Sequence, residues 1–340
     1  MPAGIGLDLG TSKTTIVIGK TVVLNEPSVV SVETDTGEPI QYGQEAYKMI
    51  GRTPDRITPI CPIERGVIAN FDAAEQMLRH FMRCALGNKM VRPRVMVTAP
   101  NSVTAVQRRS LTDAAVSSGA RIVDFIEAPV AAAIGIGIDF VKPHGTIVVD
   151  IGAGTIDVAV LSMGGLAQCE STKLGSRDFD DAIIRYVRRE HNILIGARTA
   201  EHIKKHVGSV VHRSVDIVMK AKGRNLFTGL PEMFEITAND VCDATADVSF
   251  AICNSVQSVL EKTPPELVGD IATDGMYVTG GGSLIYGMQQ MLSAYTGIPA
   301  NLVSDPFTCV AKGAAKACED PALLQNGDIE GRMLSDLEIQ

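Results

Sequence analysis

The sequence is short of positive charge, of long apolar runs and of paired cysteines, and each shortage argues against a class of protein. Its 340 residues include 31 lysines and arginines against 39 aspartates and glutamates, which gives a formal net charge of −8. A nucleic-acid surface needs concentrated Lys and Arg to neutralise phosphates, so this balance argues against a nucleic-acid partner. No apolar run approaches the roughly 18 residues of a membrane-spanning helix.

The cysteines are scattered, with no C-x-x-C spacing that would indicate a metal or redox site. This distribution favours reduced thiols, mostly buried as small hydrophobic side chains, in a cytoplasmic protein. The chain also enters its first apolar strand almost at once, so we expect neither a signal peptide nor an N-terminal amphipathic helix. The cysteines are Cys61, Cys84, Cys169, Cys242, Cys253, Cys309 and Cys318.

The length, with 45% hydrophobic and 21% charged residues, predicts a globular protein of two or more domains. Short β-rich segments alternate with segments of helical apolar spacing, such as the helix expected over residues 73–86. This alternation predicts α/β domains in which helices cover a sheet. Further helices are expected near residues 103–118, 128–135, 179–189, 199–207, 237–261 and 284–295.

One pattern occurs twice, once in each half of the chain. Residues 4–15 and 145–155 each form an apolar strand, then Asp-x-Gly, then small polar residues, and a second β-rich segment follows. Such a hairpin exposes backbone N–H groups at its tip, which suit phosphate oxygens. Asp8 and Asp150 end the first strands and are suited to hold a divalent cation through water, since Mg²⁺ keeps most of its hydration shell. Two facing hairpins would therefore clamp a nucleotide polyphosphate and its metal.

A glycine run, Gly280-Gly281-Gly282-Ser283, separates a strand near residues 276–279 from the helix expected over 284–295. Glycines let the backbone approach a ligand closely, and a helix N-terminus favours negative charge, so the run is a candidate nucleotide contact. A tight strand-to-helix turn without a ligand would explain the same pattern.

Three charged residues have two interpretations each. Glu201 and Lys204 are three residues apart on a predicted helix and share a face, where they would hold a ribose and an adenine edge or form a solvated ion pair. Lys13 in the first hairpin is either a phosphate-clamping residue or a solvent-facing side chain. The chain lacks G-x-x-x-x-G-K-[ST], so it is not a P-loop protein.

The ordered set of these motifs resembles the actin superfamily, and further stretches resemble its MreB/Mbl family of bacterial actin-like proteins. The superfamily motifs are Asp8-Leu9-Gly10-Thr11, Ile126-Glu127-Ala128-Pro129, Asp150-Ile151-Gly152-Ala153-Gly154-Thr155 and Thr279-Gly280-Gly281-Gly282. The match to the family extends over about residues 4–318 and includes Val23-Leu24-Asn25-Glu26-Pro27-Ser28, Gly223-Arg224-Asn225-Leu226 and Pro264-Pro265-Glu266-Leu267.

The resemblance implies an actin-like α/β fold: two duplicated α/β domains, each with a smaller subdomain, around a central nucleotide cleft. The expected boundaries are residues 1–140 with a subdomain at about 32–70, residues 141–320 with a subdomain at about 178–240, and a polar, flexible tail at 321–340. ATP and Mg²⁺ are the implied ligands, with Asp8 and Asp150 as catalytic residues that hold the hydrated metal. The phosphates would contact Thr11, Ser12, Lys13, Ala153, Gly154 and Thr155, and the nucleoside Glu201, Lys204, Gly281, Gly282 and Ser283.

Two positions depart from the family pattern in a way that bears on catalysis. MreB-like proteins usually carry a glutamate that orients the attacking water where this chain has Ala128, and a threonine that helps to hold the water where it has Ile156. Neither side chain present can accept a hydrogen bond, and loss of a positioned base typically costs about 10²–10⁴ in rate. We therefore expect slow or absent ATP hydrolysis with nucleotide binding retained, unless Glu127 or Asp157 substitutes.

The resemblance further implies head-to-tail, paired protofilaments at the inner face of the cell membrane, where they direct cell shape and cell-wall synthesis. The family's apolar membrane loop corresponds to residues 88–93, in which Met90 and Val91 lie between basic residues and are candidates for insertion at the lipid interface. An ordinary surface loop is the alternative. Membrane and cell-wall synthesis proteins are the expected partners, besides further copies of the chain.

Two other functions fit parts of the sequence. A nucleotide-dependent scaffold that co-assembles with a more active paralogue would explain the missing water-orienting residues. A small-molecule kinase of the same fold would need a catalytic aspartate facing a substrate pocket, and the family match outside the motifs argues against it. Filament formation by the purified chain distinguishes the cytoskeletal protein from the scaffold.

Overall fold

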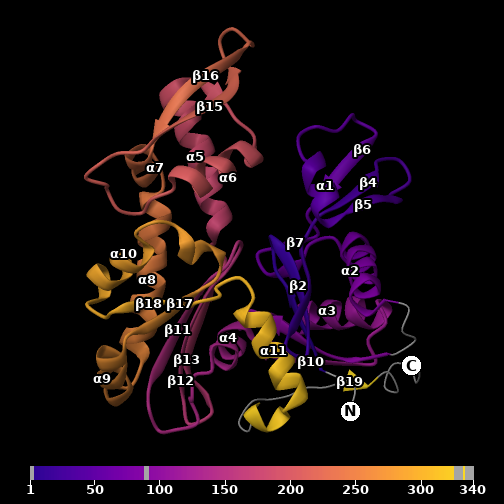
Figure 1. Cartoon of the computed structure of the whole chain (residues 1–340), viewed down its shortest axis with the longest axis vertical. Coiled ribbons are helices and arrows are strands. Elements are labelled where there is room, and N and C mark those ends of the chain that lie inside the picture. The colour runs from indigo at the N-terminus through magenta and orange to yellow at the C-terminus, as the bar shows by residue number, and fades with distance from the viewer. Residues whose placement is uncertain (1–3, 88–91, 325–331, 334–340) are drawn as a thin grey trace.

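The computed structural model describes residues 4–87, 92–324 and 332–333, which form two halves lying side by side (Figure 1). Each half has a large sheet with flanking helices in its lower part and a smaller sheet in its upper part. The large sheets have six strands in the N-terminal half and five in the other. None of the described helices is long and apolar enough to cross a lipid bilayer.

The two large sheets repeat one strand order. The order is β3-β2-β1-β9-β10 in the first, with β19 added at its edge, and β13-β12-β11-β17-β18 in the second. In each sheet the three hairpin strands are antiparallel and the last two strands run parallel to the first. The two large sheets therefore share one topology, and the repeated sequence pattern forms the start of each. The strands are β1 (Ile5–Leu9), β2 (Lys13–Ile18), β3 (Thr21–Pro27), β9 (Arg94–Ala99), β10 (Ile122–Glu127), β19 (Arg332–Met333), β11 (Thr146–Ile151), β12 (Ile156–Ser162), β13 (Gly165–Thr172), β17 (Met276–Thr279) and β18 (Ala300–Leu302).

Helices on the outer faces bury apolar stripes against these sheets. The longest in the first half, α2 (Phe71–Leu86), begins at Asn70, whose side chain accepts a hydrogen bond from a backbone N–H in the first turn at 3.0 Å. Its residues Met77 and Phe81, one turn apart, are fully buried in the core of the first half. The other outer helices are α3 (Ala105–Ser117) on the first sheet, and α8 (Ala246–Lys262), α9 (Pro265–Asp274) and α10 (Met288–Thr296) on the second.

Two helices, α4 (Ala128–Ile136) and α11 (Cys309–Glu319), lie between the large sheets and share a core with both of them (Figure 1). Their backbones are in direct contact. A Cβ atom on Gly313 would lie 1.7 Å from the Ala131 carbonyl oxygen, and one on Gly135 would lie 2.0 Å from the Cys309 carbonyl oxygen. Only glycine permits this approach. We call α4 and α11 the central helix pair.

The smaller sheets lie at the top of each half in Figure 1. The first has strand order β5-β4-β6 and the second β14-β15-β16. The elements of the first are β4 (Val30–Glu33), β5 (Pro39–Tyr42), α1 (Gly43–Met49) and β6 (Ile57–Ile60), followed by the hairpin β7 (Ile63–Glu64) and β8 (Val67–Ile68). Those of the second are α5 (Ser176–His191), β14 (Ile193–Leu194), α6 (Ala197–Val207), β15 (Val218–Asn225), β16 (Pro231–Thr237) and α7 (Ala238–Ala244).

The helix expected over residues 237–261 is divided in two, so that prediction was wrong in extent. It begins at the predicted capping box, where the Thr237 hydroxyl accepts a backbone hydrogen bond at 3.0 Å. It is then interrupted at Thr245, the residue between α7 and α8, whose hydroxyl donates to the Val241 carbonyl at 2.7 Å. Such local side-chain bonds compete with regular helical hydrogen bonding.

Three other predicted features have different outcomes. Within the tail predicted at 321–340, Pro321–Leu324 form a short 3-10 helix, and Arg332–Met333 pair antiparallel with β10. All seven cysteines are free thiols and four of them are buried, which confirms the expectation from their spacing. Met90 and Val91 lie outside the described residues, so the predicted membrane loop stays a prediction.

Candidate functional site

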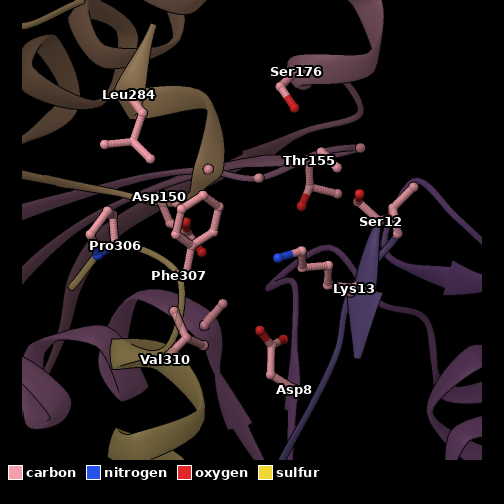
Figure 2. Close-up of a pocket in the computed structure, with 18 of the residues that line it drawn as sticks. Asp8, Ser12, Lys13, Asp150, Thr155, Ser176, Leu284, Pro306, Phe307 and Val310 are labelled. Carbon is pink, nitrogen blue, oxygen red and sulfur yellow. The ribbon is translucent and has the colours of Figure 1, made fainter. Parts of the chain in front are cut away.

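A cavity of about 520 Å³ lies between the two halves, and both predicted hairpins line it (Figure 2). The first hairpin contributes Asp8 to Lys13, and the second contributes Asp150, Gly152 to Thr155, and Asp157. Other residues that line it include Thr98, Ala128, Ser176, Glu201, Lys204, Arg213, Gly280, Gly281, Leu284, Ile285, Tyr286, Pro306, Phe307 and Val310. The structure thus brings most of the sequence-predicted site residues to one place.

The two hairpin turns have the same construction. The Gly10 N–H donates to the Lys13 carbonyl at 3.0 Å, and the Gly152 N–H donates to the Thr155 carbonyl at 2.9 Å. A Cβ on Gly10 would lie 2.7 Å from the Lys13 carbonyl oxygen, so a side chain there would open the turn. Each turn therefore closes tightly, as the Asp-x-Gly motif predicts.

The tips of the two turns touch each other across the cavity. A Cβ on Gly154 would lie 2.6 Å from the Thr11 Oγ1 atom, so a glycine is needed for this contact. The Thr11 hydroxyl in turn accepts a hydrogen bond from the Gly66 N–H at 3.1 Å. The backbone groups of both turns consequently border a single narrow space, which suits a chain of phosphates.

Three carboxylates lie together at one end of the cavity: Asp8 and Asp150, which are partly buried, and Asp157, which is buried. Burial raises the pKa of Asp8, although the Thr98 hydroxyl, which donates to it at 2.8 Å, opposes the shift. Burial and then the negative charges of Asp157 and Asp8 raise the pKa of Asp150 well above its usual value. Their ionised forms are therefore costly without a nearby cation.

The same carboxylates fit a hydrated divalent cation. Carboxylate oxygens are the ligands that Mg²⁺ prefers, and it usually binds through one or two of them while keeping several waters. Within residues 4–87, 92–324 and 332–333, no group of three His, Cys, Asp or Glu side chains is arranged to hold a metal directly. Contact with a metal through water from Asp8 and Asp150 stays a prediction.

The two positions that depart from the family pattern differ in their surroundings: one lines the cavity and the other lies in the core. Ala128, the first residue of α4, lines the cavity wall and is 8% exposed. Ile156 is fully buried in the core of the second half, because alternate residues of β12 point to opposite faces. Asp157 points into the cavity, while Glu127 does not line it. Of the two proposed substitutes for the water-orienting residue, only Asp157 is brought to the cavity.

Asp157 is held by neighbours on the adjacent strand. The Ser171 hydroxyl donates to it, and the Ser171 oxygen also accepts the Asn101 N–H at 3.1 Å. Burial raises the pKa of Asp157 to about 6, and the hydrogen bonds from Ser171 and Thr155 limit the shift. The carboxyl therefore holds its proton to a higher pH than an ordinary aspartate does.

Glu201 and Lys204 both line the cavity from α6, but they do not pair with each other. The Lys204 ammonium donates to Asp180 at 2.8 Å and to the Ser176 carbonyl at 2.6 Å. Glu201 accepts from Lys205 at 2.6 Å and from the Tyr47 hydroxyl of the other half. The solvated pair considered from the sequence was therefore wrong, and a nucleoside role for either residue stays a prediction.

The glycine run forms a 3-10 turn instead of preceding an α-helix directly. Gly280 and Gly281 line the cavity, whereas Gly282 and Ser283 are buried behind them, with the Ser283 hydroxyl donating to the Gly280 carbonyl at 2.6 Å. The helix expected from residue 284 begins at Met288, so that predicted boundary was wrong. The physical reason is Gly287, whose φ of 85° is incompatible with a continuous helix.

Lys13 points into the cavity from β2 (Figure 2). Its ammonium lies 5.0 Å from the centroid of the Phe307 ring on the opposite wall, within reach of a cation–π contact. The side chain therefore spans the cavity instead of facing only solvent, although the phosphate-clamping role stays a prediction.

Sequence reasoning missed the contacts that join the two halves beside the cavity. The Arg65 guanidinium pairs with Asp178 through two contacts of 2.7 and 2.9 Å. The Arg177 guanidinium donates to the Thr11 carbonyl at 2.8 Å. These partners are more than 100 residues apart, |i−j| being 113 for the first and 166 for the second, so no local pattern could have linked them.

The family model described as MreB/Mbl protein matches residues 2–326. The cell shape-determining protein MreB of Escherichia coli (strain K12) is 43% identical over 322 residues, or 93% of each chain. The cell shape-determining protein Mbl of Bacillus subtilis (strain 168) is 40% identical over 311 residues, covering 91% of this chain and 93% of Mbl.

Two solved structures share the fold. MreB5 of Spiroplasma citri bound to ADP superposes with a TM-score of 0.89 at 36% identity, covering 96% of this chain and 99% of MreB5. The MamK double helical filament gives a TM-score of 0.78 at 20% identity, covering 93% and 98% of the two chains, which supports the actin-like fold alone. With a family model that matches nearly its whole length and with these relatives, the chain belongs to the MreB/Mbl family of actin-like proteins.

Proposed function

We propose that this chain is an ATP-binding cytoskeletal protein that polymerises into filaments at the inner face of the cell membrane and directs cell shape and cell-wall synthesis. The observation that carries the proposal is the pair of touching glycine turns beside the partly buried carboxylates Asp8 and Asp150. Membership of a family whose curated members are cell shape-determining proteins supports it. Crystal structures of the MreB5 relative with ADP and with AMPPNP support the nucleotide ligand.

In this proposal the two turns bind the phosphates, and Asp8 and Asp150 hold hydrated Mg²⁺ at their end of the cavity. The cation would neutralise carboxylates that are otherwise costly to ionise there. The nucleoside would lie toward Glu201, Lys204 and the glycine turn. The proposed phosphate contacts are Thr11, Ser12, Lys13, Ala153, Gly154 and Thr155, and the proposed nucleoside contacts include Gly281, with Gly282 and Ser283 supporting it from behind.

Sedimentation of the purified chain tests the function. We expect paired straight filaments by negative-stain electron microscopy in the pellet with ATP, and few with ADP or without nucleotide. A matched variant, Gly154→Val, places a Cβ atom 2.6 Å from the Thr11 Oγ1 atom of the other turn, so it should bind ATP poorly and stay in the supernatant. Filaments that form equally with and without nucleotide would contradict the nucleotide-dependent proposal.

ATP hydrolysis is proposed to be slow, because the side chain at the cavity wall position 128 cannot orient a water molecule. Restoring the family pattern with Ala128→Glu and Ile156→Thr should raise phosphate release by about 10²-fold or more. Ala128→Glu alone should give most of the gain, since Ile156 lies in the core and a hydroxyl there would be buried. A natural chain that already hydrolyses ATP as fast as the double variant would refute this part.

The second candidate function is a nucleotide-binding scaffold that co-assembles with a more active paralogue, and Ala128 is the observation that favours it. A scaffold would bind ATP but form few filaments alone, and it would enter filaments when mixed with a family member that polymerises. Co-sedimentation of the two chains, compared with each alone, separates the candidates.

Membrane contact is proposed through Met90 and Val91, which lie outside the described residues. Two apolar side chains give only a few kcal/mol per subunit, and repetition along a filament would make the contact firm. Met90→Ser with Val91→Ser should abolish pelleting of filaments with anionic liposomes. Unchanged pelleting would exclude this loop.

A further inference from the structure

The cavity has two chemically different sides. Figure 2 shows Ser12 and Lys13 on one side and Leu284, Pro306 and Phe307 on the other. The second side continues into Ile285 and Tyr286, so it offers apolar and aromatic surface instead of backbone N–H groups. Such a wall suits the flat face of a nucleobase, whereas the glycine turns suit phosphates.

The side chain of Arg213 lies on this apolar side. Arg213 lines the cavity together with Tyr286, and its guanidinium carbon lies 3.5 Å from the centroid of the Tyr286 ring. The planar guanidinium therefore stacks closely on the ring, an arrangement that a lysine cannot make. A guanidinium stacked on an aromatic ring is itself a surface on which a base can stack.

The loop that carries Arg213 is held at both ends. On one side, Ser209 and Tyr286 form a parallel bridge, and the Val210 N–H donates to the Tyr286 carbonyl at 3.0 Å. On the other side, the Arg213 N–H donates to Asn239 Oδ1 at 2.8 Å, and the Asn239 amide donates back to the Arg213 carbonyl at 3.3 Å. The stack is thus in place before a ligand arrives, which reduces the entropy lost on binding.

One donor of this guanidinium lacks an acceptor. The Nε atom of Arg213 is enclosed and has no hydrogen-bond partner among the described residues. Buried polar groups in proteins are nearly always hydrogen-bonded, so an exception needs an explanation. Because this atom is enclosed, a base in the cavity would meet the face of the guanidinium and not this donor.

We propose that Arg213, stacked on Tyr286, contacts the nucleobase and makes this chain prefer a nucleoside triphosphate to a bare polyphosphate. The inference rests on the proposed nucleotide binding and adds a residue that the motifs do not contain. Glu201 and Lys204, the predicted nucleoside residues, already have two partners each, so Arg213 takes over much of the contact with the base.

Isothermal titration calorimetry with two probes tests the inference: ATP and inorganic tripolyphosphate, each with Mg²⁺. Arg213→Ala should weaken ATP binding about tenfold, equivalent to about 1.4 kcal/mol, because one base-stacking contact is lost. Tripolyphosphate affinity should stay within about twofold, since the phosphates lie at the glycine turns. Arg213→Lys keeps the charge without the plane, and it should bind ATP about as weakly as Arg213→Ala.

Arg224→Ala is the matched control, since Arg224 is exposed on β15 and does not line the cavity. It should leave both affinities unchanged. Equal loss of ATP and tripolyphosphate binding in Arg213→Ala would mean that Arg213 acts on phosphate charge, and this would overturn the inference. Unchanged ATP affinity in both Arg213 variants would overturn it as well. A natural chain that binds no ATP would instead refute the proposed function on which the inference depends.

Discussion

The ion pair between Arg65 and Asp178 gives the sharpest prediction, because Arg65 adopts an unfavourable backbone conformation to make it. Arg65 has φ of 49° and is followed by Gly66 with φ of 75°, in the tight turn between β7 and β8. Turns of this kind favour Gly, Asn or Asp, and a long side chain at positive φ costs roughly 1 kcal/mol. The strain is offset by contacts that the arginine makes with the other half of the molecule.

The magnitude follows from these contacts. Two guanidinium nitrogens of Arg65 lie 2.7 and 2.9 Å from the Asp178 carboxylate, and one also donates to the Lys173 carbonyl at 2.8 Å. Charge-assisted hydrogen bonds contribute about 1.5–3 kcal/mol, and the 40% exposure of the Arg65 side chain reduces this to about 1–2 kcal/mol. Arg65→Asn therefore removes about 1–2 kcal/mol of interaction energy between the halves. It also relieves part of the backbone strain in the turn, since Asn tolerates positive φ.

We expect Arg65→Asn to change the global free energy of unfolding little and to favour separation of the halves beside the cavity. The release rate of a fluorescent ADP analogue, measured by stopped flow, should rise by about 5–30-fold, which corresponds to the lost 1–2 kcal/mol. A double-mutant cycle with Asp178→Asn should give a coupling energy of about 1–2 kcal/mol. A release rate within about twofold of the natural chain, together with negligible coupling, would refute the reasoning.

Three further perturbations have defined outcomes. Gly313→Ala places a Cβ 1.7 Å from a carbonyl oxygen of α4, so thermal melting should show a loss above about 3 kcal/mol, whereas Gly269→Ala, with nothing within 4 Å, should be neutral or stabilising. Burial raises the pKa of Asp180 to about 6 from 3.8, so the folded state binds this proton more tightly. The stabilisation from this proton is present below about pH 4 and is lost as the pH rises through about 6. Across that range the free energy of unfolding of Asp180→Asn, measured by chemical unfolding, should therefore rise by on the order of 2 kcal/mol relative to that of the natural chain. Tyr47→Phe removes the hydroxyl that donates to Glu201 across the halves, and should speed nucleotide release by up to about fivefold, less than Arg65→Asn.

Each of these three has a result that contradicts it. Equal melting temperatures for the Gly313 and Gly269 variants would mean that the central helix pair can separate without cost. A pH-independent difference between Asp180→Asn and the natural chain would mean that Asp180 titrates normally in the folded state. Faster release from Tyr47→Phe than from Arg65→Asn would place the main contact between the halves at α1 and α6 instead of at the β7–β8 turn.

The sequence predicted the parts of this fold that depend on local chemistry. The strand and Asp-x-Gly pattern at Asp8 and at Asp150 predicted two hairpins, because glycine permits a tight turn and the flanking residues favour strands. Segments with the apolar spacing of strands alternate along the chain with segments that have the spacing of helices, and this predicted sheets covered by helices. The order of the strands repeats between the two halves, as a duplicated motif implies, and the turns border one cavity.

The features that the sequence could not supply depend on contacts between distant residues or on single-residue conformations. Arg65 and Asp178 are 113 residues apart in sequence, and Arg213 meets Tyr286 only after α6, its following loop and the glycine turn are assembled. The start of α10 depended on the positive φ of Gly287, which an apolar pattern does not reveal. Lys204 was predicted to share a face with a glutamate of its own helix, but its ammonium pairs with Asp180 of α5 instead.

The central helix pair also determines how the two halves can move. Since the backbones of α4 and α11 touch at Gly135 and Gly313, the helices cannot slide past one another without colliding main chains, which favours rotation about that crossing as the relative motion of the halves. Displacement under rotation grows with distance from the axis. In Figure 1 the smaller sheets lie farthest from the pair, so a small angular change at the cavity becomes the largest movement at the ends of the molecule, far from any atom that a ligand in the cavity would touch.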